Sequence, residues 1–214
     1  MPRPFIALVV CLLTVAAAGC LQPSLSPLIP PEQSRFDDRL IGGWSCGSHV
    51  WTFTRADFEA GLPPYYRVDI RTSDAHGQLA GWIGRVDDRD YINFMADDQA
   101  QGVPFVRQHR LGAFSFGLIA IDGTHLHIAM LSDGWVRREY EAGRLDVGVS
   151  RELSSRPTGD DAIVLTAGPP ALQAFVRRAV QDDQAFADRF DFERVAADAH
   201  ARTDATNAAC GQGR

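Results

Sequence analysis

Apolar and polar residues alternate along several short segments in the first two thirds of the chain. From Tyr66 to Arg71, apolar side chains stand at every second position with charged side chains between them, as a strand with one solvated face requires. Turn residues separate such segments, and Asp122-Gly123 predicts a hairpin turn. The pattern predicts strands at 50–54, 66–71, 79–86, 91–96, 113–121, 124–131 and 162–166.

The periodicity changes after Pro169-Pro170. Leu172, Phe175, Val176, Ala179 and Val180 are spaced i, i+3, i+4, i+7 and i+8, which predicts an amphipathic helix with proline at its start. A shorter helix is expected at 135–141. We therefore expect an α+β fold, in which an antiparallel sheet curls toward a small barrel and the C-terminal amphipathic helix closes it.

The N-terminal residues carry a processing signal. Arg3 is followed by an uncharged apolar run from Phe5 to Ala18, which is shorter than the about 20 residues that cross a bilayer and fits the apolar region of a signal peptide. The run ends in Ala17-Ala18-Gly19-Cys20, which resembles the lipobox of bacterial lipoproteins, although leucine is more frequent than alanine at the position of Ala17. An ordinary secretory signal peptide, cut at an Ala-x-Ala site, is the alternative.

The lipobox resemblance implies cleavage before Cys20 and acyl chains on that cysteine, which would hold the chain on a membrane. Leu21 stands where inner-membrane lipoproteins of this type often carry aspartate. The resemblance therefore implies an outer-membrane lipoprotein that faces the periplasm.

The sequence divides into four parts. We expect a signal peptide at 1–19, an acylated cysteine with a Pro/Ser-rich tether at 20–35, one globular β-rich domain with its C-terminal helix at 36–192, and a polar tail at 193–214.

The composition excludes several classes of function. Loss of Arg3 with the signal peptide would move the formal net charge from -6 to -7, and the arginines are scattered among more numerous acids, so nucleic acid is not an expected partner. The chain contains no lysine. Schiff-base chemistry, Ser-Lys dyads and a P-loop lysine are therefore absent.

Two cysteines remain after the signal peptide and the acylated Cys20 are set aside, namely Cys46 and Cys210. An oxidising envelope compartment favours a disulfide between them. The alternative leaves Cys210 free in the polar tail or available for a bond between chains.

No group of residues carries convincing catalytic or metal-binding chemistry. Gly43 to Gly47 matches the Gly-x-Ser-x-Gly pattern of hydrolases around Ser45, but a strand-like segment follows it where that motif needs a helix. His125 and His127 share one face of a predicted strand and are expected to point at solvent rather than bind a metal with Asp122 or Asp133. We expect no catalytic residue, no metal site and no cofactor.

Gly42-Gly43-Trp44 resembles the Gly-x-Trp at the first strand of lipocalins, some of which are bacterial lipoproteins; the later Thr-Asp-Tyr signature of that family is missing. The wider layout, from LIGGW through the strands to LTAGPPALQAFVRRA, resembles a group of uncharacterised proteobacterial lipoproteins with no known activity. The lipocalin resemblance implies that the tryptophan packs across the floor of a barrel.

Aromatic residues concentrate on the predicted strands and are expected to line either a packed core or a small apolar cavity. These are Trp44, Trp51, Phe53, Trp82, Phe114 and Phe116. The first hypothesis is a module that binds a small apolar ligand in this cavity, and the second is a structural or adaptor lipoprotein that docks an envelope protein. An enzyme, such as a hydrolase using Ser45, is the least favoured reading.

Overall fold

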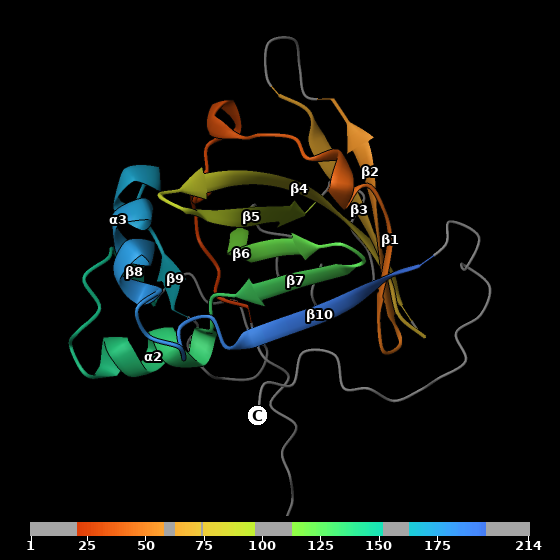
Figure 1. The fold of residues 1–214 in the computed structure, drawn as a ribbon. Coiled ribbons are helices and arrows are strands. Elements are labelled where there is room, and N and C mark those ends of the chain that lie inside the picture. Colours follow the sequence, from red (N-terminus) through yellow and green to blue (C-terminus); the bar gives the residue numbers. More distant parts are fainter. Residues whose placement is uncertain (1–20, 58–62, 74, 97–112, 152–162, 196–214) are drawn as a thin grey trace, which may run out of the picture.

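The computed structural model describes residues 21–57, 63–73, 75–96, 113–151 and 163–195 (Figure 1). The predicted signal peptide, Cys20, Cys210 and residues 196–214 lie outside these ranges. The strands are β1 (Gly42–Cys46), β2 (His49–Ala56), β3 (Tyr65–Arg71), β4 (His76–Val86), β5 (Arg89–Ala96), β6 (Phe114–Asp122), β7 (His125–Met130), β8 (Val149–Ser150), β9 (Val164–Leu165) and β10 (Asp188–Val195). The helices are α2 (Asp133–Glu141), α3 (Pro169–Ala179) and the 3₁₀ turns η1 (Pro31–Gln33) and η2 (Asp38–Leu40).

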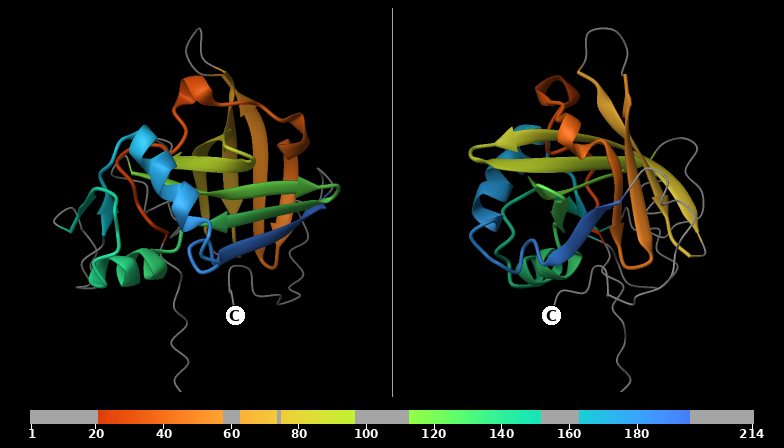
Figure 2. Two further views of the ribbon diagram at one scale, coloured as in Figure 1. Left: turned by 60° about the vertical axis from the view of Figure 1, so that its left-hand side comes forward. Right: turned by 45° about the vertical axis from the view of Figure 1, so that its right-hand side comes forward.

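Eight antiparallel strands form a closed barrel in the order β1-β10-β7-β6-β5-β4-β3-β2. Strands β1 to β7 follow one another as hairpin neighbours, and β10 fills the gap between β7 and β1 (Figure 2). Closure pairs every strand on both sides, so the barrel presents no free edge to another chain. The predicted barrel is confirmed, and each strand expected between residues 50 and 131 is present.

Alternate side chains of the strands face two different cores. One row of each strand points into the barrel and forms the inner core. On β4, β5 and β6 the other row is also buried, under a layer outside the barrel, and forms the outer core. The inner core consists of Leu21, Leu40, Trp44, Trp51, Phe53, Tyr66, Val68, Ile70, Leu79, Ile83, Ile92, Phe94, Ile119, Leu126, Ile128, Met130 and Phe192. The outer core consists of Leu28, Ile29, Trp82, Val86, Tyr91, Phe116, Leu131, Trp135, Val136, Ile163, Leu165, Leu172, Phe175, Val176, Ala179, Ala185 and Phe186.

Helix α3 has the expected apolar stripe but not the expected place. Its buried residues Leu172, Phe175, Val176 and Ala179 pack in the outer core, so the helix lies against the outside of the barrel wall (Figure 1). The expectation that it closes the barrel at the C-terminus is wrong. A strand, β10, follows the helix and closes the barrel, and it extends to Val195, past the expected domain boundary at residue 192.

The segment expected to be a free tether is instead packed on the domain. Gln22 and Ser24 are 1% and 0% exposed, and Leu28 and Ile29 are 0% and 1% exposed. The backbone N–H groups of Leu28 and Ile29 both donate to Oδ1 of Asn93, at 2.9 and 3.2 Å. The four prolines of this segment did not prevent its apolar side chains from filling the outer core.

Among the described residues, no helix has the length and apolar character that a membrane span needs.

Candidate functional site

The aromatic residues proposed to line one cavity divide between the two cores. Trp44, Trp51 and Phe53 belong to the inner core, whereas Trp82 and Phe116 belong to the outer core and Phe114 packs against it. The two groups lie on opposite faces of the barrel wall, because Trp82 and Phe116 occupy outward positions of β4 and β6. One ligand cannot contact both groups.

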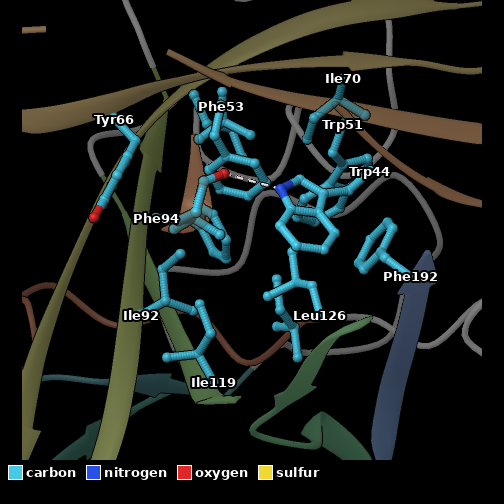
Figure 3. Close-up of a cluster of buried hydrophobic side chains, with 14 of the residues drawn as sticks. Trp44, Trp51, Phe53, Tyr66, Ile70, Ile92, Phe94, Ile119, Leu126 and Phe192 are labelled. Atoms are coloured by element: carbon cyan, nitrogen blue, oxygen red, sulfur yellow. Dashed lines mark hydrogen bonds between the residues drawn. The ribbon is translucent and has the colours of Figure 1, made fainter. Parts of the chain in front are cut away.

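Aromatic rings fill the described part of the barrel interior. Trp51 is 1% exposed, and its ring lies 5.1 Å from Phe192, 5.6 Å from Phe190 and 5.7 Å from Phe94. Figure 3 shows Trp51, Phe94 and Phe192 gathered with Leu126 and Ile119 inside the barrel. Eight-stranded barrels have just enough room for side chains or for one small ligand. Here the large rings take up that room.

Trp44 closes one end of the barrel. Its indole N–H donates to the carbonyl oxygen of Leu40 at 2.9 Å, and the guanidinium of Arg194 lies over its ring, 4.2 Å from the centroid. Arg194 also donates to the carbonyl oxygens of Ile41, at 2.9 Å, and Arg39. The tryptophan therefore packs across the barrel floor as the Gly-x-Trp resemblance implies. The hydrogen bonds of Arg194 connect β10 to the turn that covers this end of the barrel.

Trp82 serves the outer core in a different way. Its indole N–H donates to the carbonyl oxygen of Ile29 at 2.7 Å, and its ring lies edge-on to Phe114 at 6.0 Å. The side chain thus holds the segment that follows Leu21 against the barrel wall.

A groove of about 650 Å³ lies over the outer faces of β6 and β7. Strand register places Leu118, Ala129 and Arg189 in one row across β6, β7 and β10, and Ala120, His127 and Asp191 in the next. Leu118, Ala120 and Ala129 form a narrow apolar floor with charged side chains beside it. The second wall comes from residues 180–186 after α3 and from the β4–β5 turn.

Acids outnumber bases along the groove. Its lining contains the acids Asp88, Asp90, Asp182, Asp183 and Asp191 and the bases Arg39, Arg89 and Arg189. Asp182 accepts a hydrogen bond from the indole N–H of Trp135 at 2.8 Å, which holds the pKa of its carboxyl below the usual value. With histidine neutral, the lining carries a net negative charge and suits a partner that presents basic side chains.

His127 lies directly across from Ala120 at the floor of the groove. Its Nδ1 lies 2.7 Å from a carboxylate oxygen of Asp191, and its ring stacks on that of His125 at a centroid distance of 6.3 Å. Both histidines are exposed, as predicted. The residues described contain no cluster of three or more His, Cys, Asp or Glu side chains placed to hold a metal ion. Among the described residues, those that line the groove include no Ser, Thr or Cys side chain that could act as a nucleophile.

Ser45 and Cys46 lie within β1 and lead into a tight turn to β2. No helix follows, so Gly43 to Gly47 does not form the strand-turn-helix elbow that this hydrolase pattern requires. Cys46 is the only cysteine among the described residues. Because Cys210 lies outside the described residues, the disulfide between these two cysteines stays a prediction.

The sequence does not predict the groove, because its residues come from segments far apart in the chain: β6, β7, β10, the segment after α3, the β4–β5 turn and Arg39. One signal was available. Arg189 to Arg194 alternates polar and apolar residues, with Phe190 and Phe192 between charges, and this pattern predicts the strand that forms one side of the groove.

Neither family models, nor curated proteins, nor solved structures match this chain.

Proposed function

We propose that this protein is an envelope lipoprotein, acylated on Cys20 and held on the outer membrane facing the periplasm, whose barrel is a packed scaffold that docks another envelope protein. The Ala17-Ala18-Gly19-Cys20 pattern after an apolar run supports the anchor. The groove over β6 and β7 is the proposed docking site.

The observation that carries this proposal is the contrast between a filled interior and an open outer groove. Trp44, Trp51 and Phe53 are each at most 1% exposed. A small apolar ligand inside the barrel, the first hypothesis from sequence, would have to displace these rings at a cost of several kcal/mol. The groove needs no such rearrangement.

The chemistry of the groove favours an extended segment of the partner with a small apolar side chain flanked by basic residues. The floor offers Leu118, Ala120 and Ala129, and the acids of the walls would pair with the basic groups. Recognition would run through side chains, because the barrel strands below have no unpaired backbone groups to offer.

Crosslinking in intact cells tests the docking site. A photoreactive p-benzoylphenylalanine replaces Ala120, which is exposed on the groove floor, or Thr54, which is exposed on β2. The matched control is Thr54, because β2 lies four strands from β6 in either direction around the barrel. We expect one discrete crosslinked protein from position 120, none from position 54, and a weaker product when Asp183→Arg reverses a wall charge. Equal products from both positions would exclude the groove.

Labelling with radioactive palmitate tests the anchor separately. We expect label on the full-length protein and none on a Cys20→Ala variant, because the lipobox resemblance identifies no other acylated residue. Label retained by the Cys20→Ala protein would show that the anchor lies elsewhere.

A further inference from the structure

The residues directly after Cys20 are fixed to the domain. Leu21 is 5% exposed and forms a β-bridge with Ser132. The side-chain amide of Gln22 donates to the carbonyl oxygen of Ile163 at 2.8 Å. Ser24 exchanges backbone hydrogen bonds with Phe114, at 2.8 and 2.7 Å. The chain is therefore bonded to the domain from Leu21 onward, without a flexible linker between this residue and the barrel.

Leu21 also marks one particular end of the barrel. Its side chain belongs to the inner core, and Ser132 follows the end of β7, where Met130 pairs with the first residue of β10. Because neighbouring strands are antiparallel, the β1–β2 and β3–β4 turns lie at this same end. We name it the Leu21 rim, with described turn residues 47–48, 72–73, 75 and 131–132. Both views of Figure 2 place the β1–β2 turn and the start of β10 on the lower side of the barrel.

The opposite end is the Leu40 rim, with described residues 35–41, 57, 63–64, 87–88 and 123–124. There, η2 inserts Leu40 into the inner core. The chain from Leu28 to Arg35 runs along the outside of β4 toward this rim, where the N–H of Arg35 donates to the carbonyl oxygen of Ile83.

We infer that the barrel sits directly on the phospholipid surface in one orientation, with the Leu21 rim against the headgroups and the Leu40 rim away from them. The inference rests on the acylation of Cys20 proposed above. One residue spans about 3.5 Å, so acyl chains on Cys20 would enter the bilayer within a few ångströms of Leu21. The fixed segment replaces the expected tether and sets the orientation.

The charge of the Leu40 rim agrees with this orientation. The described turn residues of the Leu21 rim are uncharged, and Asp74 of the β3–β4 turn lies outside the described residues. The Leu40 rim carries more acids than bases: Asp37, Asp38, Asp57, Asp87 and Asp88 against Arg35 and Arg39. An anionic lipid surface repels the acidic Leu40 rim.

Depth-dependent fluorescence quenching tests the orientation. The full acylated protein carries one fluorophore on Ser73→Cys, at the Leu21 rim, or on Thr124→Cys, at the Leu40 rim; both are exposed turn hydroxyls. Each is reconstituted in vesicles of phosphatidylethanolamine and phosphatidylglycerol that contain a nitroxide-headgroup lipid. We expect quenching several times stronger at position 73 than at position 124.

A second variant isolates the role of the fixed segment. A Gly/Ser insertion of about 16 residues between Cys20 and Leu21 adds a flexible link with an r.m.s. length of about 22 Å. We expect this protein to float with vesicles as before but to lose most of the difference between the two positions. Equal quenching in the protein without the insertion, or a difference that the insertion leaves unchanged, would overturn the inference while acylation stood. Failure of the protein without the insertion to float would overturn the anchor and the orientation together.

Discussion

The inner and outer cores are both apolar and both buried, but different kinds of sequence build them. Inner-core residues come mostly from every second position of the barrel strands, so closing the barrel buries them together. The outer core joins one face of β4 to β6 with α3, β9 and the proline-rich segment before η1. Its parts are far apart in the chain. Hydrogen bonds of buried polar groups hold these parts together, and the groups include Gln22, Asn93 and Trp82.

This difference indicates that burial has a different role in the inner core than in the outer core. The inner core makes the scaffold stable, whereas the outer core attaches the segment that follows Cys20 and thereby fixes where the proposed lipid anchor emerges. Damage to the inner core should unfold the whole barrel, and damage to the outer core should first release that segment.

The largest effect is expected from Trp51→Ala. The substitution removes a ring that contacts Phe94 and Phe192 and leaves a cavity inside the barrel, which should lower the free energy of unfolding by about 3 to 5 kcal/mol. Urea unfolding followed by circular dichroism measures the loss. A loss below about 1 kcal/mol would mean that the interior is not tightly packed.

A smaller and more local effect is expected from Asn93→Ala. The backbone N–H groups of Leu28 and Ile29 would lose their shared acceptor, at a cost of about 2 to 3 kcal/mol. Hydrogen exchange measured by mass spectrometry should accelerate in residues 21–35 and stay unchanged in β2 and β3.

Gln78→Ala is the matched control for Asn93→Ala. Gln78 points outward from β4 as Asn93 does from β5, but its side chain bonds Asp69 rather than the N-terminal segment. It should leave exchange in residues 21–35 unchanged. Uniform acceleration across the chain in the Asn93→Ala protein would contradict the separation of the two cores.

Alkaline pH tests one tyrosine in each core. Burial raises the pKa of Tyr66 in the inner core and of Tyr91 in the outer core to about 12, above the ordinary value of 10.0. Because the folded-state pKa is the higher one, their contribution to stability is complete below pH 10 and is lost as the pH rises toward 12. At about pH 11 each tyrosine should cost about 1.4 kcal/mol.

Urea unfolding at pH 8 and at about pH 11 measures this loss. Tyr66→Phe and Tyr91→Phe should each remove about half of the pH dependence. An unchanged pH dependence in either variant would show that its tyrosine ionises as readily in the folded protein as in the unfolded chain.

The smallest effect is expected from Arg194→Lys. An ammonium group keeps the positive charge near Trp44 but cannot bond the carbonyl oxygens of Arg39 and Ile41 with one planar fork. The melting temperature should fall by about 2 to 4 °C, which corresponds to about 1 kcal/mol. Arg189→Lys, on the same strand at the groove, should leave the melting temperature unchanged. An equal fall in the two variants would show that any arginine-to-lysine change on β10 has this effect.

Local patterns predicted the parts of the fold that depend on local order. The alternation in Tyr66 to Arg71 and the stripe from Leu172 to Val180 correspond to β3 and α3. The location of α3 could not be predicted, because an apolar stripe specifies that a face is buried and not which surface covers it.

The proline-rich segment was misread for a related reason. Composition alone suggested a tether, but Leu28 and Ile29 bury side chains, and Asn93 supplies the acceptor for their backbone N–H groups from a strand far along the chain. The groove depends in the same way on cross-strand register. Leu118, Ala129 and Arg189 become neighbours only when β6, β7 and β10 pair.

Native mass spectrometry of the protein purified from membranes tests the central claim most directly, since it weighs covalent acyl chains and any bound ligand together. We predict the mass of a chain that begins at Cys20 and carries acyl groups, with no further loss of mass after organic extraction, because large buried rings occupy the inner core. An extractable apolar molecule bound to the folded protein would contradict the packed scaffold, and a chain without acyl groups would contradict the anchor.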